Sequence, residues 1–384
     1  MLEITSNVHN STLTTAIKGR IDSTNAAEFE ALMTEADTEE HLILNAEELE
    51  YISSAGLRVI LKLRKKHSDL KIVNVSPAVY EIFDITGFTE MIKIKRAYRT
   101  VSVDGCDVIG KGANGTVYRL DSDTVIKVYP NADALDDIEH ERDVARKALV
   151  LGVPTAIPFD VVKVEDHYAS VFEMLNAESF SMLIAKHPED MDRYIVKFVE
   201  LLKQIHSTRV PEGQFPKQKE VLMKWIKGIE GQVPEDVYAK LYRLCEEVPE
   251  SDCMIHGDYH TKNLMLQNDE VILIDMDTLA VGHPVLEFAS IYNAFIGFYA
   301  VDHESIVGFQ GFDYDTGLRI WNETLHLYFE TDDEELLSLR EKQAKTVGLI
   351  RILRRIIRRN GDAGLADYCR NELCRLAGEL ESLT

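Results

Sequence analysis

The chain has 384 residues and a net charge of −23, with 45% apolar and 28% charged residues. This length predicts two or three domains, and the negative charge argues against nonspecific nucleic-acid binding. No run of eighteen apolar residues occurs, so we expect no membrane span. The first residues lack the basic start and apolar stretch of a signal peptide. Five scattered cysteines without metal-binding spacing indicate reduced thiols, and we expect a cytoplasmic protein.

The first hundred residues alternate strand and helix patterns. Strands are predicted at 13–21, 41–46 and 70–75, and helices at 25–36, 54–67 and 76–87. The second helix ends in basic residues, as a helix C-terminus favours. The third begins with Ser76 and Pro77, a cap and first turn, and stops at Gly87. The pattern predicts a small α/β layer domain over residues 1–100.

Three motifs of this region, in this order, resemble the STAS domain of anti-sigma-factor antagonists: "GRIDSTNAAEFE", "LEYISSAGLRVILKLRKK" and "SPAVYEIFDITGF". In that family, a serine at the start of the helix before "GL" is phosphorylated by a partner kinase, which switches partner binding. The resemblance therefore implies a module that binds a protein partner, with Ser53 and Ser54 as candidate phosphosites.

Two interpretations of these serines stay open. A helix N-terminus accommodates a phosphate, but a serine there is also an ordinary N-cap. Ala55 and Gly56, directly before the leucine, cannot be phosphorylated, and Asn45 stands where the family often has an acid.

A second domain is expected over residues 104–384, β-rich at first and mostly helical from residue 133. Its "GKGANG" segment has the GxGxxG form, with Gly110, Gly112 and Gly115. A dinucleotide-binding loop would open a helix, whereas here the strand candidate "TVYRL" follows. A strand, a glycine loop and a second strand form the lid over ATP phosphates in kinases.

Lys127 lies in the apolar strand "VIKVY", twelve residues after Gly115. It is either an exposed edge lysine or the lysine that meets the nucleotide's phosphates in kinases. The second interpretation requires an ion pair with a helix acid. We choose Glu141, with Glu139 as the competitor, on a helix whose buried face is expected to include Ile138, Ala145 and Leu149.

The segment "HGDYHTKN" at 256–263 places Asp258 and Asn263 five residues apart, the spacing of a kinase catalytic loop. Asp258 would accept or orient the proton of the acceptor hydroxyl. Asn263 and Asp275, at the end of "VILIDMD", would hold Mg²⁺, which prefers oxygen ligands. His256 and His260 could be zinc ligands, but a third ligand is missing nearby, which favours a structural role.

Together these parts resemble the aminoglycoside phosphotransferase and choline kinase-like family over about residues 104–384, through "HGDYHTKNLML", "LIDMDTLAVGHPVLEFAS" and "LLKQIHST". The resemblance implies a bilobal protein-kinase-like domain using ATP and Mg²⁺, with an N-lobe at about 104–175 and a C-lobe at about 176–384. It also implies that adenine lies against the backbone of Glu173 to Leu175. Asp277 and Glu287 depart from the family pattern.

The acceptor is not indicated by any motif. The acidic charge suits a hydroxyl compound that also carries an amine. The basic segment 345–359 either contacts an anionic partner or membrane phosphates, or its arginines pair with acids of the same protein. We expect a small-molecule kinase with a regulatory STAS domain. The alternatives are a signalling kinase acting on a STAS serine in cis or in trans, and a pseudokinase scaffold.

Overall fold

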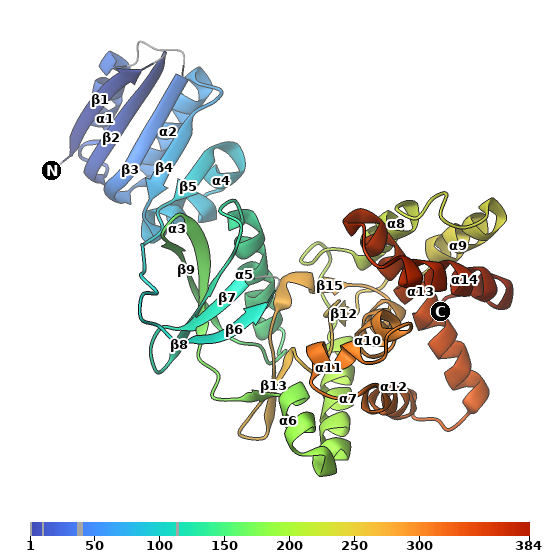
Figure 1. The fold of residues 1–384 in the computed structure, drawn as a ribbon. Coiled ribbons are helices and arrows are strands. Elements are labelled where there is room, and N and C mark those ends of the chain that lie inside the picture. Colours follow the sequence, from blue (N-terminus) through green and yellow to red (C-terminus); the bar gives the residue numbers. More distant parts are fainter. Residues whose placement is uncertain (1, 10, 37–40, 113–114) are drawn as a thin grey trace. The chain divides into compact units, whose positions relative to one another are not determined.

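The computed structural model describes residues 2–9, 11–36, 41–112 and 115–384 (Figure 1). The chain forms two compact units, one of Met1–Ser102 with Val162–Asp166 and one of Val103–Val161 with His167–Thr384. All five cysteines are free thiols. No helix in the described part of the chain combines the length and apolar character that a bilayer crossing requires.

The first unit contains a five-stranded sheet in the order β1-β2-β3-β4-β5. β1 runs antiparallel to β2, and the other neighbours are parallel. The strands are β1 (Glu3–His9), β2 (Thr12–Ile21), β3 (His41–Ile52), β4 (Lys71–Val75) and β5 (Lys93–Arg96). The sequence did not predict β1 and β5, because β1 is exposed along most of its length and β5 has only four residues.

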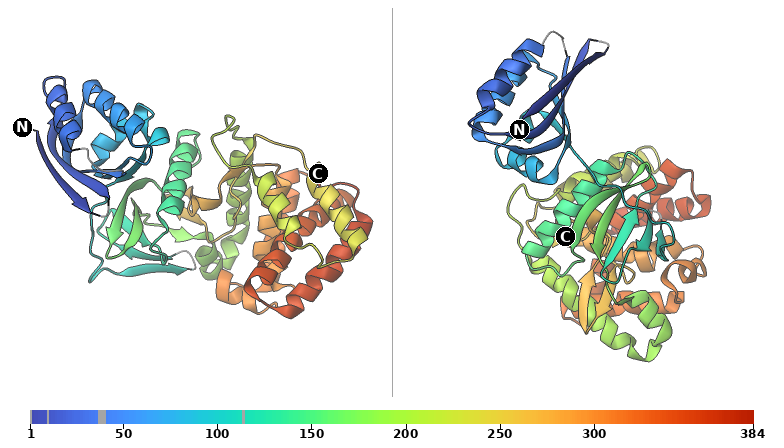
Figure 2. Two further views of the ribbon diagram at one scale, coloured as in Figure 1. Left: turned by 90° about the horizontal axis from the view of Figure 1, so that it is seen from above. Right: turned by 90° about the vertical axis from the view of Figure 1, so that its left-hand side faces the viewer.

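Helices cover one face of this sheet, as the two views in Figure 2 show. Alternate residues of β2 are buried, which is the pattern of a sheet with one covered face. The helices are α1 (Ala26–Ala36), α2 (Ser54–Lys66), α3 (Pro77–Ile85) and α4 (Phe88–Met91). Ser76 is the N-cap residue of α3 and Pro77 begins the helix, as predicted, although the Ser76 side chain makes no capping hydrogen bond.

A second five-stranded sheet has the order β6-β7-β8-β10-β9. Its strands are β6 (Val108–Gly112), β7 (Gly115–Arg119), β8 (Thr124–Val128), β9 (Pro158–Val164) and β10 (His167–Glu173). Helix α5 (Leu135–Val150) packs against β10 and buries Ile138, Val144, Ala145 and Ala148. The prediction that Leu149 belongs to the buried face was wrong, since Leu149 is exposed near the end of the helix.

The rest of the second unit is mostly helical (Figure 1). Strand β12 pairs with β15, and β13 pairs with β14. The polar motifs lie in the segments between β12 and β13 and between β14 and β15. The elements are β11 (Glu178–Ser179), α6 (Phe180–Lys186), η1 (Pro188–Asp190), α7 (Met191–Ser207), α8 (Gln218–Lys227), α9 (Glu235–Glu247), β12 (Met254–Ile255), β13 (Leu264–Gln267), β14 (Glu270–Leu273), η2 (Met276–Thr278), β15 (Ala280–Val281), α10 (Val285–Phe295), η3 (Gly297–Tyr299), α11 (Ser305–Gln310), α12 (Tyr314–Phe329), α13 (Glu334–Arg359) and α14 (Ala363–Glu379).

Helix α10 is the centre of the helical region, because every one of its residues is buried. It packs along α13, which contributes Leu349, Ile350, Ile352 and Leu353 to the same interior. The apolar face of α13 is therefore part of the core and is not available to lie on a membrane. This argues against the membrane contact that the sequence left open for the amphipathic basic segment, and leaves its contact with an anionic partner open.

Candidate active site

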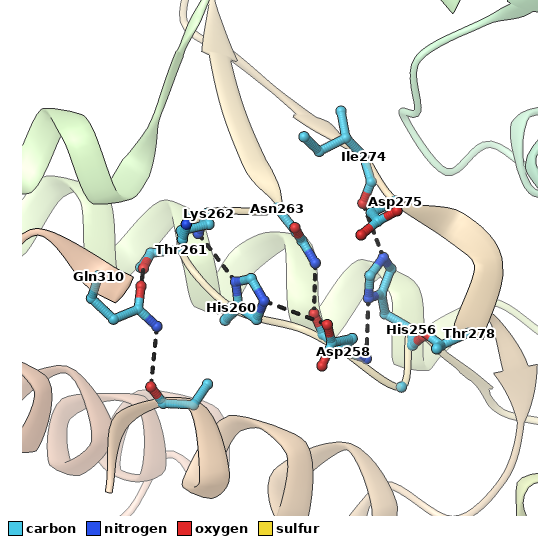
Figure 3. Close-up of polar contacts among 12 residues, drawn as sticks. His256, Asp258, His260, Thr261, Lys262, Asn263, Ile274, Asp275, Thr278 and Gln310 are labelled. Carbon is cyan, nitrogen blue, oxygen red and sulfur yellow. Dashed lines mark hydrogen bonds and ion pairs between the residues drawn. The ribbon is translucent and has the colours of Figure 1, made fainter. Parts of the chain in front are cut away.

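The segment 256–263 forms a loop between β12 and β13 (Figure 3). Gly257 has φ +81°, and a Cβ there would lie 2.7 Å from the Thr278 carbonyl oxygen, so glycine is required. Asn263 Nδ2 donates to the Asp258 carbonyl oxygen at 3.0 Å, closing the loop across its five-residue span. The loop holds Asp258 and Asn263 at the same cleft.

The Asp258 carboxylate has a histidine on one side and an arginine on the other. His260 Nε2 lies 3.5 Å from Asp258 Oδ2, and Arg351 Nη2 of α13 lies 3.5 Å from Asp258 Oδ1. Burial raises the pKa of Asp258, but the hydrogen bond and charge of His260 and the charge of Arg351 outweigh burial and hold the pKa well below its usual value. The carboxylate is therefore anionic at neutral pH and available as a proton acceptor.

His256 and His260 position this loop. The Asp258 backbone N–H donates to His256 Nδ1 at 3.3 Å, and His256 Nε2 donates to the Ile274 carbonyl oxygen at 3.3 Å (Figure 3). His260 Nδ1 accepts from the Lys262 backbone N–H at 3.3 Å. Among the described residues no group of three His, Cys, Asp or Glu side chains could hold a metal ion, so nothing supports zinc.

Glu287 anchors the start of the loop, a role that the sequence did not reveal. This carboxylate on α10 is fully buried and accepts hydrogen bonds from the backbone N–H groups of His256 and Gly257. The sequence marked Glu287 only as a departure from the family pattern. Its role depends on how α10 packs beneath the loop, and no local motif records that packing.

Lys127 lies inside the sheet, because β8 is flanked by β7 and β10. The alternative of an exposed edge lysine is therefore wrong. Its Nζ lies 3.0 Å from Glu141 Oε1 and 2.8 Å from Asp275 Oδ1. Burial lowers the pKa of Lys127, but the charges of Glu141 and Asp275 outweigh burial and raise the pKa above its ordinary value. Lys127 is thus a fixed cation that joins β8, α5 and the β14–η2 segment.

Asp275 has φ +62°, a left-handed conformation that is uncommon for residues other than glycine. Such strain concentrates at functional sites, where surrounding structure maintains it. Two residues later, burial and the charges of Asp275 and Glu141 raise the pKa of Asp277 to about 7. Asp277 thus lies in the field of two neighbouring carboxylates as well as of Lys127.

The glycine loop lies at the turn between β6 and β7, whose residues 113–114 are outside the described part of the chain. Gly115 has φ +145°, and a Cβ there would lie 2.4 Å from the Val128 carbonyl oxygen. Only glycine fits this position. At the other end of the sheet, the Glu173 side chain accepts from the Ile157 backbone N–H at 2.8 Å, fixing the end of β10.

One cleft of about 1270 Å³ gathers the predicted site residues of the second unit. Its lining includes Gly110, Gly112, Gly115, Lys127, Glu141, Glu173, Leu175, Asp258, Asn263 and Asp275. Five arginines of α13 line the same cleft: Arg351, Arg354, Arg355, Arg358 and Arg359. The expectation that these arginines pair with acids was wrong except for Arg351. Among the described residues, the other four have no carboxylate within 4.0 Å.

The two candidate phosphosites lie at the start of α2 in the first unit. Ser53 is the N-cap, and its hydroxyl accepts from the Gly56 backbone N–H at 3.4 Å. Ser54 is the first residue of the helix and is exposed. A Cβ on Gly56 would lie 2.6 Å from Ile21 Cγ2, which explains why this position has no side chain. The capping role is therefore assigned to Ser53, while Ser54 is free for modification.

Comparison with known families explains this arrangement. The sequence model of the phosphotransferase enzyme family matches residues 106–317, more than half of the chain. The chain belongs to the phosphotransferase enzyme family. The STAS domain model matches residues 3–101 of this phosphotransferase. Both predicted resemblances are confirmed, as is the fold class of an α/β STAS domain followed by a kinase-like domain.

The relatives of this phosphotransferase divide between its two domains. Over 88 residues it is 36% identical to BtrV of Bordetella bronchiseptica, whose name designates an anti-sigma factor antagonist; the match covers 21% of this chain and 76% of BtrV. A solved GDP complex of an aminoglycoside 2′-phosphotransferase IIIa variant matches with a TM-score of 0.50 and 13% identity, covering 78% of this chain and 97% of that chain. At that identity the second match shows a shared fold.

Proposed function

We propose that the second unit transfers the γ-phosphate of ATP to a hydroxyl of a small molecule, in a reaction that depends on Mg²⁺. The observation that carries the proposal is the meeting of the Lys127–Glu141–Asp275 cluster and the Asp258–Asn263 loop in one cleft. A lysine paired with a helix acid and a pair of oxygen ligands beside a carboxylate base are the parts that phosphoryl transfer requires.

In this proposal the N-lobe, about residues 104–175, binds the nucleotide. The loop of Gly110, Gly112 and Gly115 covers the phosphates, since backbone without side chains can approach them closely. Lys127 contacts the phosphates, and its two carboxylate partners hold Nζ in place beforehand. The backbone from Glu173 to Leu175 lines the same cleft and is available to hydrogen-bond the adenine.

Asn263 and Asp275 are suited to hold Mg²⁺. Asn263 Nδ2 donates a hydrogen bond to the Asp258 carbonyl oxygen, which leaves the Asn263 amide oxygen to bind a metal ion. Asp275 supplies carboxylate oxygens, and the raised pKa of the neighbouring Asp277 shows that negative charge is crowded there. Amide and carboxylate oxygens are the ligands that Mg²⁺ prefers. When bound, the ion would neutralise charge on the β- and γ-phosphates.

Asp258 is the proposed base. The acceptor oxygen forms a bond to the γ-phosphorus while the bond from that phosphorus to the β–γ bridging oxygen breaks, which releases ADP. Asp258 takes the hydroxyl proton. His260 and Arg351 keep this carboxylate anionic and aimed at the cleft, and Glu287 fixes the backbone of the loop that carries it.

The nucleotide assignment is tested by thermal unfolding. ATP with Mg²⁺ should raise the melting temperature, because ligands that bind the folded state stabilise it. Asp275→Asn should remove the Mg²⁺-dependent part of the shift, and Lys127→Ala should weaken the whole shift. A wild-type chain whose melting temperature does not move with millimolar nucleotide and Mg²⁺ would overturn the proposal.

We propose that the STAS domain is a protein-interaction module, with Ser54 as the better candidate phosphosite. Ser54 is exposed, whereas the Ser53 hydroxyl already caps α2. A phosphate on Ser54 would add a charge of about −1.5 to −2 at a helix N-terminus, where anions are favoured. The exposure of Ser54 also supports a second candidate function, a kinase acting on a STAS serine in cis or in trans.

Mass spectrometry after incubation with ATP and Mg²⁺ separates these functions. Phosphate on Ser54 that disappears in Asp258→Asn would favour the protein-kinase alternative. The Ser53→Ala variant should lose about 1 kcal/mol of stability, the usual cost of a lost N-cap, while Ser54→Ala should lose almost none. If partner binding is identical in wild type and in Ser54→Ala, the switch assigned to Ser54 is refuted. A pseudokinase scaffold would show neither phosphoprotein nor turnover.

A further inference from the structure

Five arginines of α13 form one charged face. They occupy positions i, i+3, i+4, i+7 and i+8 from Arg351 to Arg359, which lie on the same side of a helix. At a rise of about 1.5 Å per residue, the face extends for about 12 Å along the helix axis. Arg351, its first member, contacts the Gly257 carbonyl oxygen at 3.0 Å and the Asp258 carboxylate at 3.5 Å. The face therefore begins at the catalytic loop.

The remaining four arginines crowd one another, and none has a carboxylate within 4.0 Å among the described residues, although the charge of Asp258 acts to raise the pKa of Arg355. Burial and the charge of Arg358 lower the pKa of Arg354, and burial with the charges of Arg359 and Arg351 lowers the pKa of Arg355. The Arg355 guanidinium lies 5.1 Å from the centre of the Phe298 ring, which fixes its direction. The chain has a net charge of −23, yet these four arginines on one wall of the cleft have no carboxylate within 4.0 Å in the ranges that the structure describes. An anionic ligand would give their guanidinium groups hydrogen-bonding partners.

A second set of unsatisfied groups lies on the opposite helix. Ser290 and Asn293 of α10 are 3% and 2% exposed, and both line the cleft. Among the described residues neither Ser290 Oγ nor Asn293 Oδ1 has a hydrogen-bond partner. Asn293 Nδ2 donates to the Gly348 carbonyl oxygen at 3.0 Å, so its amide orientation is set. Buried polar atoms of this kind normally have partners, so these two point to a polar ligand.

We infer that the acceptor is a small alcohol that carries an anionic group, a phosphate or a carboxylate, bound by the face of α13 arginines that begins at Asp258. The inference rests on the proposed phosphotransfer and names its substrate class. Guanidinium groups bind phosphate and carboxylate oxygens through paired hydrogen bonds. The negative charge of the whole chain favours an amine-bearing acceptor, but the local charge of this wall favours the opposite.

Three other roles for the arginines are less well supported. Cations near a helix C-terminus interact favourably with its dipole, but Arg351, Arg354 and Arg355 precede the last turn. A membrane surface would need the apolar face of α13, which is buried against α10. The phosphates of ATP already have Lys127 and the glycine loop on the other side of the cleft.

The test measures binding of inorganic phosphate and of succinate to the full chain by calorimetry at constant ionic strength. The chain is first saturated with Mg²⁺ and a non-hydrolysable ATP analogue, so that the nucleotide's own phosphate sites are filled. We expect at least one of the two anions to bind. The Arg355→Gln/Arg358→Gln variant should bind it about tenfold or more weakly, the loss expected for a charge-assisted hydrogen bond. Which anion binds more tightly tells a phosphate from a carboxylate acceptor.

The control is Arg319→Gln, which removes one positive charge from α12, where Arg319 pairs with Asp192 outside the cleft. It should leave both affinities unchanged. If the first variant does not fold, the test is repeated with Arg358→Gln/Arg359→Gln. Both of these residues are exposed, so we expect that variant to fold.

Four results would overturn the inference: no binding of either anion, binding that all arginine variants retain, binding that the nucleotide analogue abolishes, and binding to phosphatidylglycerol vesicles in place of the small anions. Failure of the analogue itself to bind would instead refute the proposed function.

Discussion

The two walls of the cleft differ in how their cations are compensated. On the nucleotide side, Lys127 has carboxylate oxygens of Glu141 and Asp275 at 3.0 and 2.8 Å. On the acceptor side, Arg354, Arg355, Arg358 and Arg359 have no carboxylate within 4.0 Å in the described part of the chain. A cation with internal partners is held in one position before any ligand arrives. A cation without them has its charge free for a ligand.

This difference indicates a division of labour between the walls. The nucleotide side is preorganised, as phosphoryl transfer requires, because its catalysis depends on positioning and on charge stabilisation. In our proposal, the acceptor side supplies binding energy and selectivity through groups that the folded chain leaves unsatisfied. Substitutions on the first wall should therefore cost both stability and turnover, whereas those on the second should affect mainly the acceptor.

Lys127→Ala should have the largest effect on folding. It leaves Glu141, whose side chain is only 4% exposed, beside Asp275 without its cation. Removing one partner of a buried ion pair costs about 3–5 kcal/mol, measured as the change in the free energy of unfolding in urea. The double variant Lys127→Met/Glu141→Leu should recover part of that loss, because the buried charge of Glu141 is removed as well, while Asp275 and the Tyr129 hydroxyl still lose their partners. If the free energy of unfolding of Lys127→Ala falls by less than about 1 kcal/mol, the Lys127–Glu141 pair is not buried in solution.

Glu287→Gln should have an intermediate effect. The variant keeps the shape of the side chain but weakens two charge-assisted hydrogen bonds to the backbone of His256 and Gly257. We expect a loss of about 1.5–3 kcal/mol in urea unfolding, together with slower turnover. Nucleotide affinity should be unchanged, because Glu287 lies beneath the loop and not at the phosphates. Glu287→Asp, which retains the charge, should lose less. Equal losses in both variants would mean that the charge has no part in holding the loop.

Ser290→Ala should have the smallest effect on folding, within about 0.5 kcal/mol of the wild type, because its hydroxyl has no partner to lose. Thr278→Val is the matched comparison, since its hydroxyl donates to the His256 carbonyl oxygen at 2.7 Å. That variant should lose about 1 kcal/mol. Urea unfolding without ligands measures both. A Ser290→Ala loss above about 1.5 kcal/mol would mean that the hydroxyl is already satisfied, and that it does not await a ligand.

The same contrast explains how far the sequence could be interpreted. The nucleotide side consists of short motifs, in which the spacing of Asp258 and Asn263 or of Gly115 and Lys127 is set by local backbone. Such spacings can be recognised without knowing the tertiary structure. The same holds for the alternating strands and helices of the STAS domain, although β1 and β5 carried too little apolar pattern to be predicted.

The acceptor side could not be predicted in this way. It joins α10 to α13, two helices far apart in the chain, and an arginine face looks the same in sequence whether or not acids pack against it. Only the packing shows that Arg351 reaches the catalytic loop while its four neighbours have no acid nearby. The burial of Glu287 beneath His256 and Gly257 was hidden for the same reason.

The central claim is that Asp258 acts as the base of an Mg²⁺-dependent phosphotransferase, and its most direct test is the loss of γ-phosphate from ATP. The slow transfer to water can be followed in wild type and in Asp258→Asn under the same conditions, with nucleotide affinity measured alongside. We predict that Asp258→Asn loses about 10²–10⁴ in rate, the usual contribution of a general base, and still binds Mg²⁺ and ATP as the wild type does. Full activity in Asp258→Asn would contradict the claim and remove the loop at 256–263 from the chemistry.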